Sequence, residues 1–180
     1  MSDLNKYIEF VKKWEGGLGK GTNDSSSKYP CPTPYKGVNG YHTNKGITYR
    51  AWVNVFGKDN DSRFFAMSDD DWWKVFHDSF WSKMQLDEIE NFKVAALTCD
   101  IGWMSGTARG IITLQRGLKI QSDGIIGKQT LSAVNKANPI ELLEAMYKER
   151  ERFLREIGVG KNSIYLKGWL NRLENFKKVF

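Results

Sequence analysis

The sequence predicts a mainly α-helical fold, with one long loop or small β-hairpin near the N-terminus. Apolar residues recur at helical spacing in most segments, whereas Gly, Ser, Asn and Pro are concentrated between Leu18 and Thr43. That stretch also holds three of the four prolines. Because these residues favour turns, we expect helices on both sides of an irregular segment, within which residues 38–41 could form a tight hairpin turn.

The first predicted helix runs from Asp3 to Trp14. Its apolar residues fall on one face, and they are Leu4, Tyr7, Ile8, Val11 and Trp14. Glu15 follows directly, and Gly16-Gly17 ends the helix because glycine is favoured just beyond a helix C-terminus. The pattern therefore places a carboxylate at a helix C-terminal end.

The middle of the chain predicts two capped helices and one buried helix. Thr48 can cap a helix that ends at Gly57, and Ser68 can cap another whose first turn holds three aspartates. The segment 91–103 is apolar almost all round, which is typical of a buried central helix. The inward face of the helix after Ser68 would consist of Trp72, Phe76 and Phe80.

The C-terminal half predicts four further helices. Short helices are expected at 111–118 and 128–136, and a final one from about Ser163. Between them, Asn138, Pro139 and Glu141 combine an N-cap, a first-turn proline and a capping acid, which opens a long helix to Gly158.

Composition narrows the classes of function. A formal charge of +6 favours polyanionic partners, but Lys and Arg form no run long enough for a nucleic-acid-binding arm, so a nucleic-acid partner is not predicted. The chain has no Walker loop or dinucleotide fingerprint, so we expect no cofactor. Cys31 and Cys99 lack metal-ligand spacing with His42 and His77, so we expect no metal; buried thiols are favoured over a disulfide.

No apolar stretch approaches the roughly 18 residues that span a bilayer, and the N-terminus lacks the apolar core of a signal peptide. We therefore expect a protein that is synthesised in the cytoplasm without a signal peptide and without stable membrane insertion. For a chain of this size, a monomer is the default expectation. A substrate beyond the membrane would be reached through lysis, a holin-like pore or an exporter.

Five short runs occur in a characteristic order: Trp14 to Gly17, Thr43 to Thr48, Leu114 to Leu118, Asp123 to Thr130 and Gly168 to Arg172. Together they resemble glycoside hydrolase family 108, the lysozyme-like muramidases of phages and bacteria, joined to a predicted peptidoglycan-binding domain. The resemblance implies a lysozyme-like helical fold and endolysin-like cleavage of peptidoglycan between N-acetylmuramic acid and N-acetylglucosamine. It also implies a catalytic lobe at 1–95 and a peptidoglycan-binding-like lobe at 96–180, packed as one compact unit, with action on the cell wall or periplasm after release.

Glu15 is the candidate proton donor. Glycosidic cleavage needs a carboxylic acid that is still protonated near neutral pH. A helix C-terminus supplies negative potential, Trp14 could supply an apolar wall, and Gly16-Gly17 leaves room for a sugar. The alternative is that Glu15 is an exposed acid at a helix end.

Asp24 is the candidate second carboxylate, because it follows Glu15 by nine residues, a spacing similar to that in related lysozymes, where the aspartate holds or activates the attacking water. The family's Asp-Pro-Gly-Gly is absent here, and Asp24 could equally shape an Asx turn. Without a second carboxylate, a hydroxyl of the substrate itself could capture the intermediate, as in a lytic transglycosylase.

Four further residues are candidates for substrate binding. Thr43 and Asn44 could orient water or sugar hydroxyls, or could only shape a turn. Tyr41 and Trp103 could stack on sugar rings. We interpret Asp100 as structural, whereas the segment 123–130 could either bind glycan or dock the C-terminal helices. A non-catalytic cell-wall-binding or secretion-accessory protein is the alternative class, although retention of Glu15-Gly16-Gly17 favours an enzyme.

Overall fold

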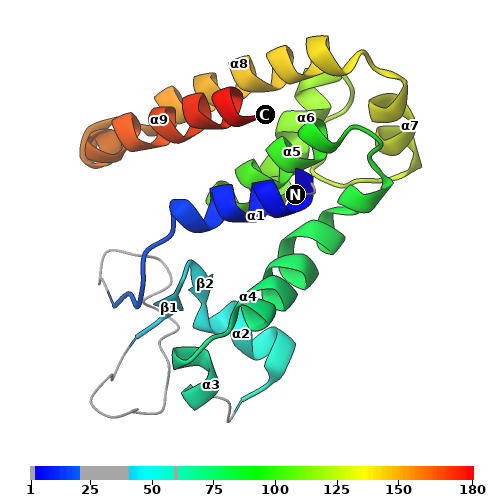
Figure 1. The fold of residues 1–180 in the computed structure, drawn as a ribbon. Coiled ribbons are helices and arrows are strands. Elements are labelled where there is room, and N and C mark those ends of the chain that lie inside the picture. Colours follow the sequence, from blue (N-terminus) through cyan, green and yellow to red (C-terminus); the bar gives the residue numbers. More distant parts are fainter. Residues whose placement is uncertain (1–2, 21–40, 59–60) are drawn as a thin grey trace. The chain divides into compact units, whose positions relative to one another are not determined.

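The computed structural model describes residues 3–20, 41–58 and 61–180, so Asp24, Cys31 and the expected turn at 38–40 lie outside the described residues. The described chain is mainly helical, as predicted, with one small antiparallel sheet (Figure 1). It divides into two compact units, one made of Met1–Phe10 with Trp81–Phe180 and the other of Val11–Phe80. Helix α1 (Asp3–Lys13) contributes to both, so this division does not follow the expected boundary at 95/96.

In the unit Val11–Phe80, the sheet is a two-residue hairpin. Strand β1 (Thr43–Asn44) pairs with β2 (Ile47–Thr48), with Thr43 opposite Thr48. The turn residues have positive φ, 46° at Lys45 and 77° at Gly46, the left-handed pair that a two-residue hairpin requires. Lys45 is held there because its Nζ donates to the Met67 carbonyl and its own carbonyl accepts from Trp72 Nε1.

Three short helices pack around this hairpin, namely α2 (Tyr49–Phe56), α3 (Asp61–Phe65) and α4 (Asp69–Phe76). Thr48 caps α2 by accepting from the Ala51 amide, and Ser68 forms a capping box with Asp71, so both expected caps are confirmed. The core is aromatic, with Trp52, Phe64, Trp72 and Phe76 fully buried. A π-helical turn, η2 (His77–Trp81), follows α4.

The other unit is built around α5. Nine successive residues of α5, from Val94 to Gly102, are buried, which confirms the expected central helix. Helix α6 crosses it closely, since a Cβ on Gly110 would lie 2.5 Å from the Thr98 carbonyl oxygen. The elements from the π-turn onward are η3 (Ser82–Met84), η4 (Leu86–Glu88), α5 (Phe92–Ser105), α6 (Thr107–Gly117), α7 (Lys128–Lys136), α8 (Pro139–Ile157), η5 (Gly160–Asn162) and α9 (Ser163–Val179).

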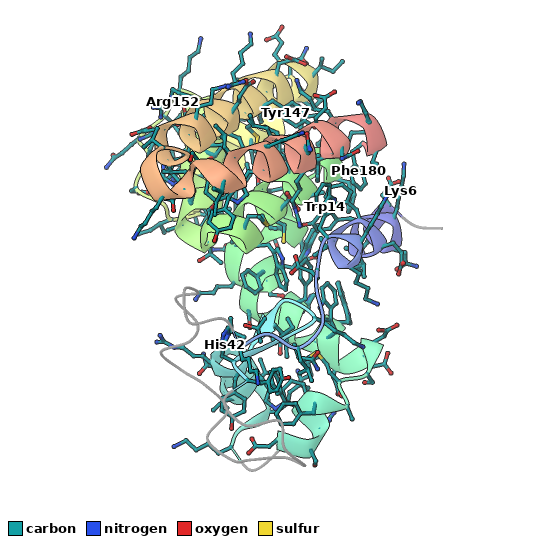
Figure 2. All side chains as sticks on the ribbon, turned by 90° about the vertical axis from the view of Figure 1, so that its left-hand side faces the viewer. Lys6, Trp14, His42, Tyr147, Arg152 and Phe180 are labelled. Carbon is teal, nitrogen blue, oxygen red and sulfur yellow. The ribbon has the colours of Figure 1, made fainter. Side chains whose placement is uncertain are left out.

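Helices α8 and α9 lie side by side over this unit (Figure 1), and α9 returns to the start of the chain. Figure 2 labels Lys6 and Phe180, whose segments meet there: Lys6 Nζ donates to the Val179 carbonyl and lies 5.3 Å from the Phe180 ring centroid. Phe176 contacts the rings of Tyr7 and Phe10 edge to face. The first turns of α1 are therefore part of the core beneath α9.

Cys99 is a buried free thiol, as expected. Burial raises the pKa of this thiol well above its usual range, so it stays protonated at neutral pH. In the part of the chain that the structure describes, no helix is long and apolar enough to cross a membrane.

The pH dependence of stability should depend on Glu149 in α8. Hydrogen bonds from Arg152 and Arg116 lower its pKa from 4.5 to about 2. Because the folded pKa is depressed, this stabilisation is fully present above about pH 4.5 and is lost as the pH falls through about 2. We expect Glu149→Gln to lower the free energy of unfolding by about 1 kcal/mol near neutral pH and by much less near pH 2.

Urea denaturation of both proteins across this range measures the difference. Glu156→Gln is the matched control, because Glu156 also accepts from Arg152 but its side chain is 63% exposed, so its effect should be smaller. A loss in Glu149→Gln that does not change with pH would contradict the assignment.

Candidate active site

Glu15 lies just beyond the end of α1, in the unit Val11–Phe80. The amides of Trp14 and Glu15 donate to the carbonyls of Val11 and Lys12, at 3.0 and 3.1 Å, so the turn that carries Glu15 is fixed to the helix. Glu15 and Trp14 are partly buried. Gly16 and Gly17 are exposed, and no heavy atom of the described residues lies within 4 Å of a Cβ added at either. As far as the described residues go, the backbone beside Glu15 is therefore open at these two positions.

A backbone bridge ties this segment to the hairpin. The Gly19 amide donates to the Thr43 carbonyl at 2.8 Å, and the His42 amide donates to the Gly19 carbonyl at 3.0 Å. The structure thus brings Glu15 and the segment of Tyr41, Thr43 and Asn44 into one unit. Trp103 is partly buried on α5 in the other unit.

Thr43 is partly buried and its hydroxyl has a defined partner. Its Oγ1 lies 2.8 Å from Nδ1 of His42, whose side chain is only 2% exposed. Metal-ligand spacing did not reveal this contact of His42, for which its position next to Thr43 in the sequence was the available signal. A hydroxyl fixed in this way can orient a water molecule or a sugar hydroxyl.

Asn44 links the hairpin to the end of α3. It is 5% exposed, and its Nδ2 donates to the carbonyl of Phe64 at 2.7 Å and to that of Phe65 at 3.4 Å. These carbonyls are at the end of α3, where no further helical turn can satisfy them. Asn44 therefore joins the hairpin to α3, and its amide donors are directed to the backbone. This geometry supports the turn-shaping alternative over sugar binding.

Tyr41 is partly buried beside the same elements. Its ring is edge to face with Phe65 at 6.2 Å, and Lys20 Nζ lies 5.3 Å from its centroid. These contacts orient the ring; whether it also stacks on sugar stays a prediction.

Four described aspartates elsewhere in this unit have partners of their own. Glu15 is the only glutamate between residues 11 and 80. Asp61 accepts from the Tyr49 hydroxyl at 2.7 Å, and Asp69 lies 3.2 Å from Lys12 Nζ. Hydrogen bonds from Arg63 and Lys74 lower the pKa values of Asp71 and Asp78, respectively. A lowered pKa is the opposite of what a proton donor needs, so neither aspartate fits that role.

The segment 123–130 is organised by Gln115, which is 1% exposed. Its Nε2 donates to Asp123 Oδ1 at 2.7 Å and its Oε1 accepts from the Gly124 amide at 2.9 Å. Gly124 has φ of +76°, which a side chain would disfavour. These contacts support the docking interpretation of this segment. Across residues 3–20, 41–58 and 61–180, no group of three or more His, Cys, Asp or Glu side chains is placed to hold a metal ion.

Comparison with known proteins gives two family matches. Residues 8–106 match the family described as Glycosyl hydrolase 108, and residues 109–174 match the one described as Predicted Peptidoglycan domain. Among solved structures, SagA of Brucella abortus is similar at 25% identity with a TM-score of 0.76, over 98% of this chain and 92% of that one. No curated protein sequence matches this chain. The matches meet between residues 106 and 109, later in the chain than the expected boundary at 95/96.

The structural role of Asn44 can be tested by Asn44→Ala. The change leaves a buried carbonyl without its donor, so we expect a loss of about 1–3 kcal/mol in the free energy of unfolding. Urea denaturation measures it, with Asn54→Ala, at an exposed position of α2, as the matched control. Unchanged stability with weakened peptidoglycan binding would instead assign Asn44 to the substrate.

Proposed function

Because the chain belongs to glycosyl hydrolase family 108 and is a peptidoglycan hydrolase, we propose that it is a muramidase that cleaves between N-acetylmuramic acid and N-acetylglucosamine, with Glu15 as general acid. The observation that carries the proposal is the position of Glu15. It lies within the family match, on a turn fixed to α1, beside two glycines with open space at their Cβ positions.

The reaction that we propose begins with proton transfer from Glu15 to the glycosidic oxygen. The bond from that oxygen to the anomeric carbon of the muramic acid then breaks, and the developing positive charge spreads to the ring oxygen. A water molecule adds to the anomeric carbon and gives up a proton to a carboxylate, either that of Asp24 or the one left on Glu15, which yields a reducing muramic acid end.

We propose Asp24 as the group that positions this water, on the nine-residue spacing alone. Thr43 is a second contributor, since its hydroxyl is oriented by His42. If neither activates water, attack by a hydroxyl of the muramic acid itself would give an anhydro end and a lytic transglycosylase.

Glu15→Gln removes the proton but keeps the shape of the side chain. We expect the rate of release of soluble fragments from purified peptidoglycan to fall at least about 100-fold, with an unchanged melting temperature. Mass spectrometry of the wild-type products should find reducing-end N-acetylmuramic acid. Glu9→Gln is the matched control, because Glu9 is an exposed residue of the same helix.

Each product identifies a different reaction. Reducing N-acetylglucosamine ends would refute the muramidase, and anhydro-muramic ends would replace hydrolysis by transglycosylation. Full activity of Glu15→Gln would remove Glu15 from the mechanism.

Asp24→Asn tests the second carboxylate. If Asp24 activates water, we expect kcat to fall at least about tenfold with little change in KM, because the interaction acts mainly in the transition state. Asp70→Asn, at an exposed position of α4, is the control for a lost surface charge. Wild-type kcat in Asp24→Asn would show that another group orients the water.

A further inference from the structure

Three arginines, Arg109 of α6, Arg150 of α8 and Arg172 of α9, interact electrostatically with one another near Asp100 of α5. Asp100 and Arg172 form a buried ion pair, with Arg172 Nη2 at 2.7 Å and Nε at 3.2 Å from Asp100 Oδ1. This pair joins α5 to α9. It satisfies Arg172, and Arg150 of α8 lies in the electrostatic field of the same carboxylate.

Arg150 is a buried cation without a carboxylate of its own. It is 5% exposed, and its one hydrogen bond to the described residues runs from Nη1 to Ser105 Oγ at 2.9 Å. No carboxylate in the part of the chain that the structure describes lies within 4.0 Å of its guanidinium. Burial lowers the pKa of Arg150 to about 10, so the side chain still carries its charge at neutral pH. Buried charges in proteins are normally paired, because desolvation without a partner is costly.

Arg109 adds a third positive charge at the same place. Its guanidinium carbon lies 4.1 Å from the Phe153 ring centroid, and that of Arg150 lies 5.6 Å from the same centroid. Both Arg109 and Arg172 repel the charge on Arg150 and contribute to lowering its pKa. Three guanidinium groups thus share one carboxylate, which leaves an excess of positive charge around Phe153.

We propose that Arg150 and Arg109, together with Ser105, bind a carboxylate of the peptide stem of peptidoglycan. A guanidinium presents five donors in a plane that matches a carboxylate, and Arg150 uses one of them on Ser105. Ser105 is exposed at the end of α5, which brings this donor set to the surface. An incoming carboxylate would supply the countercharge that the described residues lack.

Peptidoglycan is the source of the anion that fits best. Arg109, Arg150 and Arg172 all lie within residues 109–174, the match described as Predicted Peptidoglycan domain, and the anionic groups of peptidoglycan are the carboxylates of its peptides. This inference rests on peptidoglycan as the substrate and not on the role of Glu15, so it can fail or succeed independently of the muramidase mechanism.

A groove between α8 and α9, of about 390 Å³, is the competing location in this unit. Its lining includes Tyr147 and Arg155. Arg155 Nη2 already donates to Glu151 Oε1 at 2.7 Å, so this cation has a partner. Arg155 therefore provides a matched control on the same helix as Arg150.

The test uses the full chain and a disaccharide-tetrapeptide muropeptide, N-acetylglucosaminyl-N-acetylmuramyl-peptide, which lacks the bond that a muramidase cleaves. Titration calorimetry compares this muropeptide with a form whose carboxylates are converted to methylamides. We expect the amidated form to bind at least tenfold more weakly. Arg150→Gln and Arg109→Gln should each weaken binding of the free form at least tenfold and bring it close to that of the amidated form, whereas Arg155→Gln should leave it unchanged.

Equal affinity of the wild-type protein for the two muropeptides would by itself overturn the proposal. A loss in Arg155→Gln but not in Arg150→Gln would move the site to the groove between α8 and α9. If inorganic phosphate bound more tightly than the free muropeptide and lost affinity in the same arginine variants, the site would be reassigned to phosphate-bearing polymers. Arg109→Gln keeps the test valid if Arg150→Gln does not fold, because Arg109 is less buried.

Discussion

The larger unit, Met1–Phe10 with Trp81–Phe180, depends on the burial of Asp100 in the middle of the apolar helix α5. Since α5 is buried on all sides from Val94 to Gly102, the charge of Asp100 must be matched from another element, and Arg172 of α9 supplies the match. That pairing fixes α9 over α5, and one turn later Phe176 reaches the rings of Tyr7 and Phe10 in α1. A single buried ion pair therefore sets which helix covers the core. Among the described residues, it also leaves Arg150 without a carboxylate within 4.0 Å.

The smaller unit depends instead on backbone pairing at its hairpin. The Lys45-Gly46 turn sets the register, Asn44 joins the hairpin to α3, and the bridge from Gly19 to Thr43 fixes the segment that follows Glu15. None of these contacts needs a large apolar surface. Backbone hydrogen bonds on both sides of Glu15 fix its segment, and none of them needs a side chain at Gly16 or Gly17.

Local signals in the sequence predicted most of the helices. Periodicity and caps gave α4, α7 and α8, whose starts coincide with the residues after Ser68, Gly127 and Asn138. A small hairpin near the N-terminus was predicted, but its position at 43–48 was not, because its turn begins with Lys45 rather than the asparagine or aspartate that usually marks a left-handed pair. Helix α3, of five residues, is too short to show a period. The role of Asn44 depends on α3, twenty residues away, so no local pattern could reveal it.

Charge matching separates the structural groups from the functional candidates in both units. Asp71 and Asp78 are matched by cations, which stabilises the ionised form and removes them as proton donors. By the same reasoning, Arg172 is matched by Asp100 and is structural, whereas Arg150 and Arg109 surround an aromatic ring with an excess of charge. Such an excess weakens the fold by repulsion, and it is compensated when an anion binds. A protein with a net charge of +6 that acts on a carboxylate-rich polymer gains from concentrating part of that charge where a single carboxylate can be held.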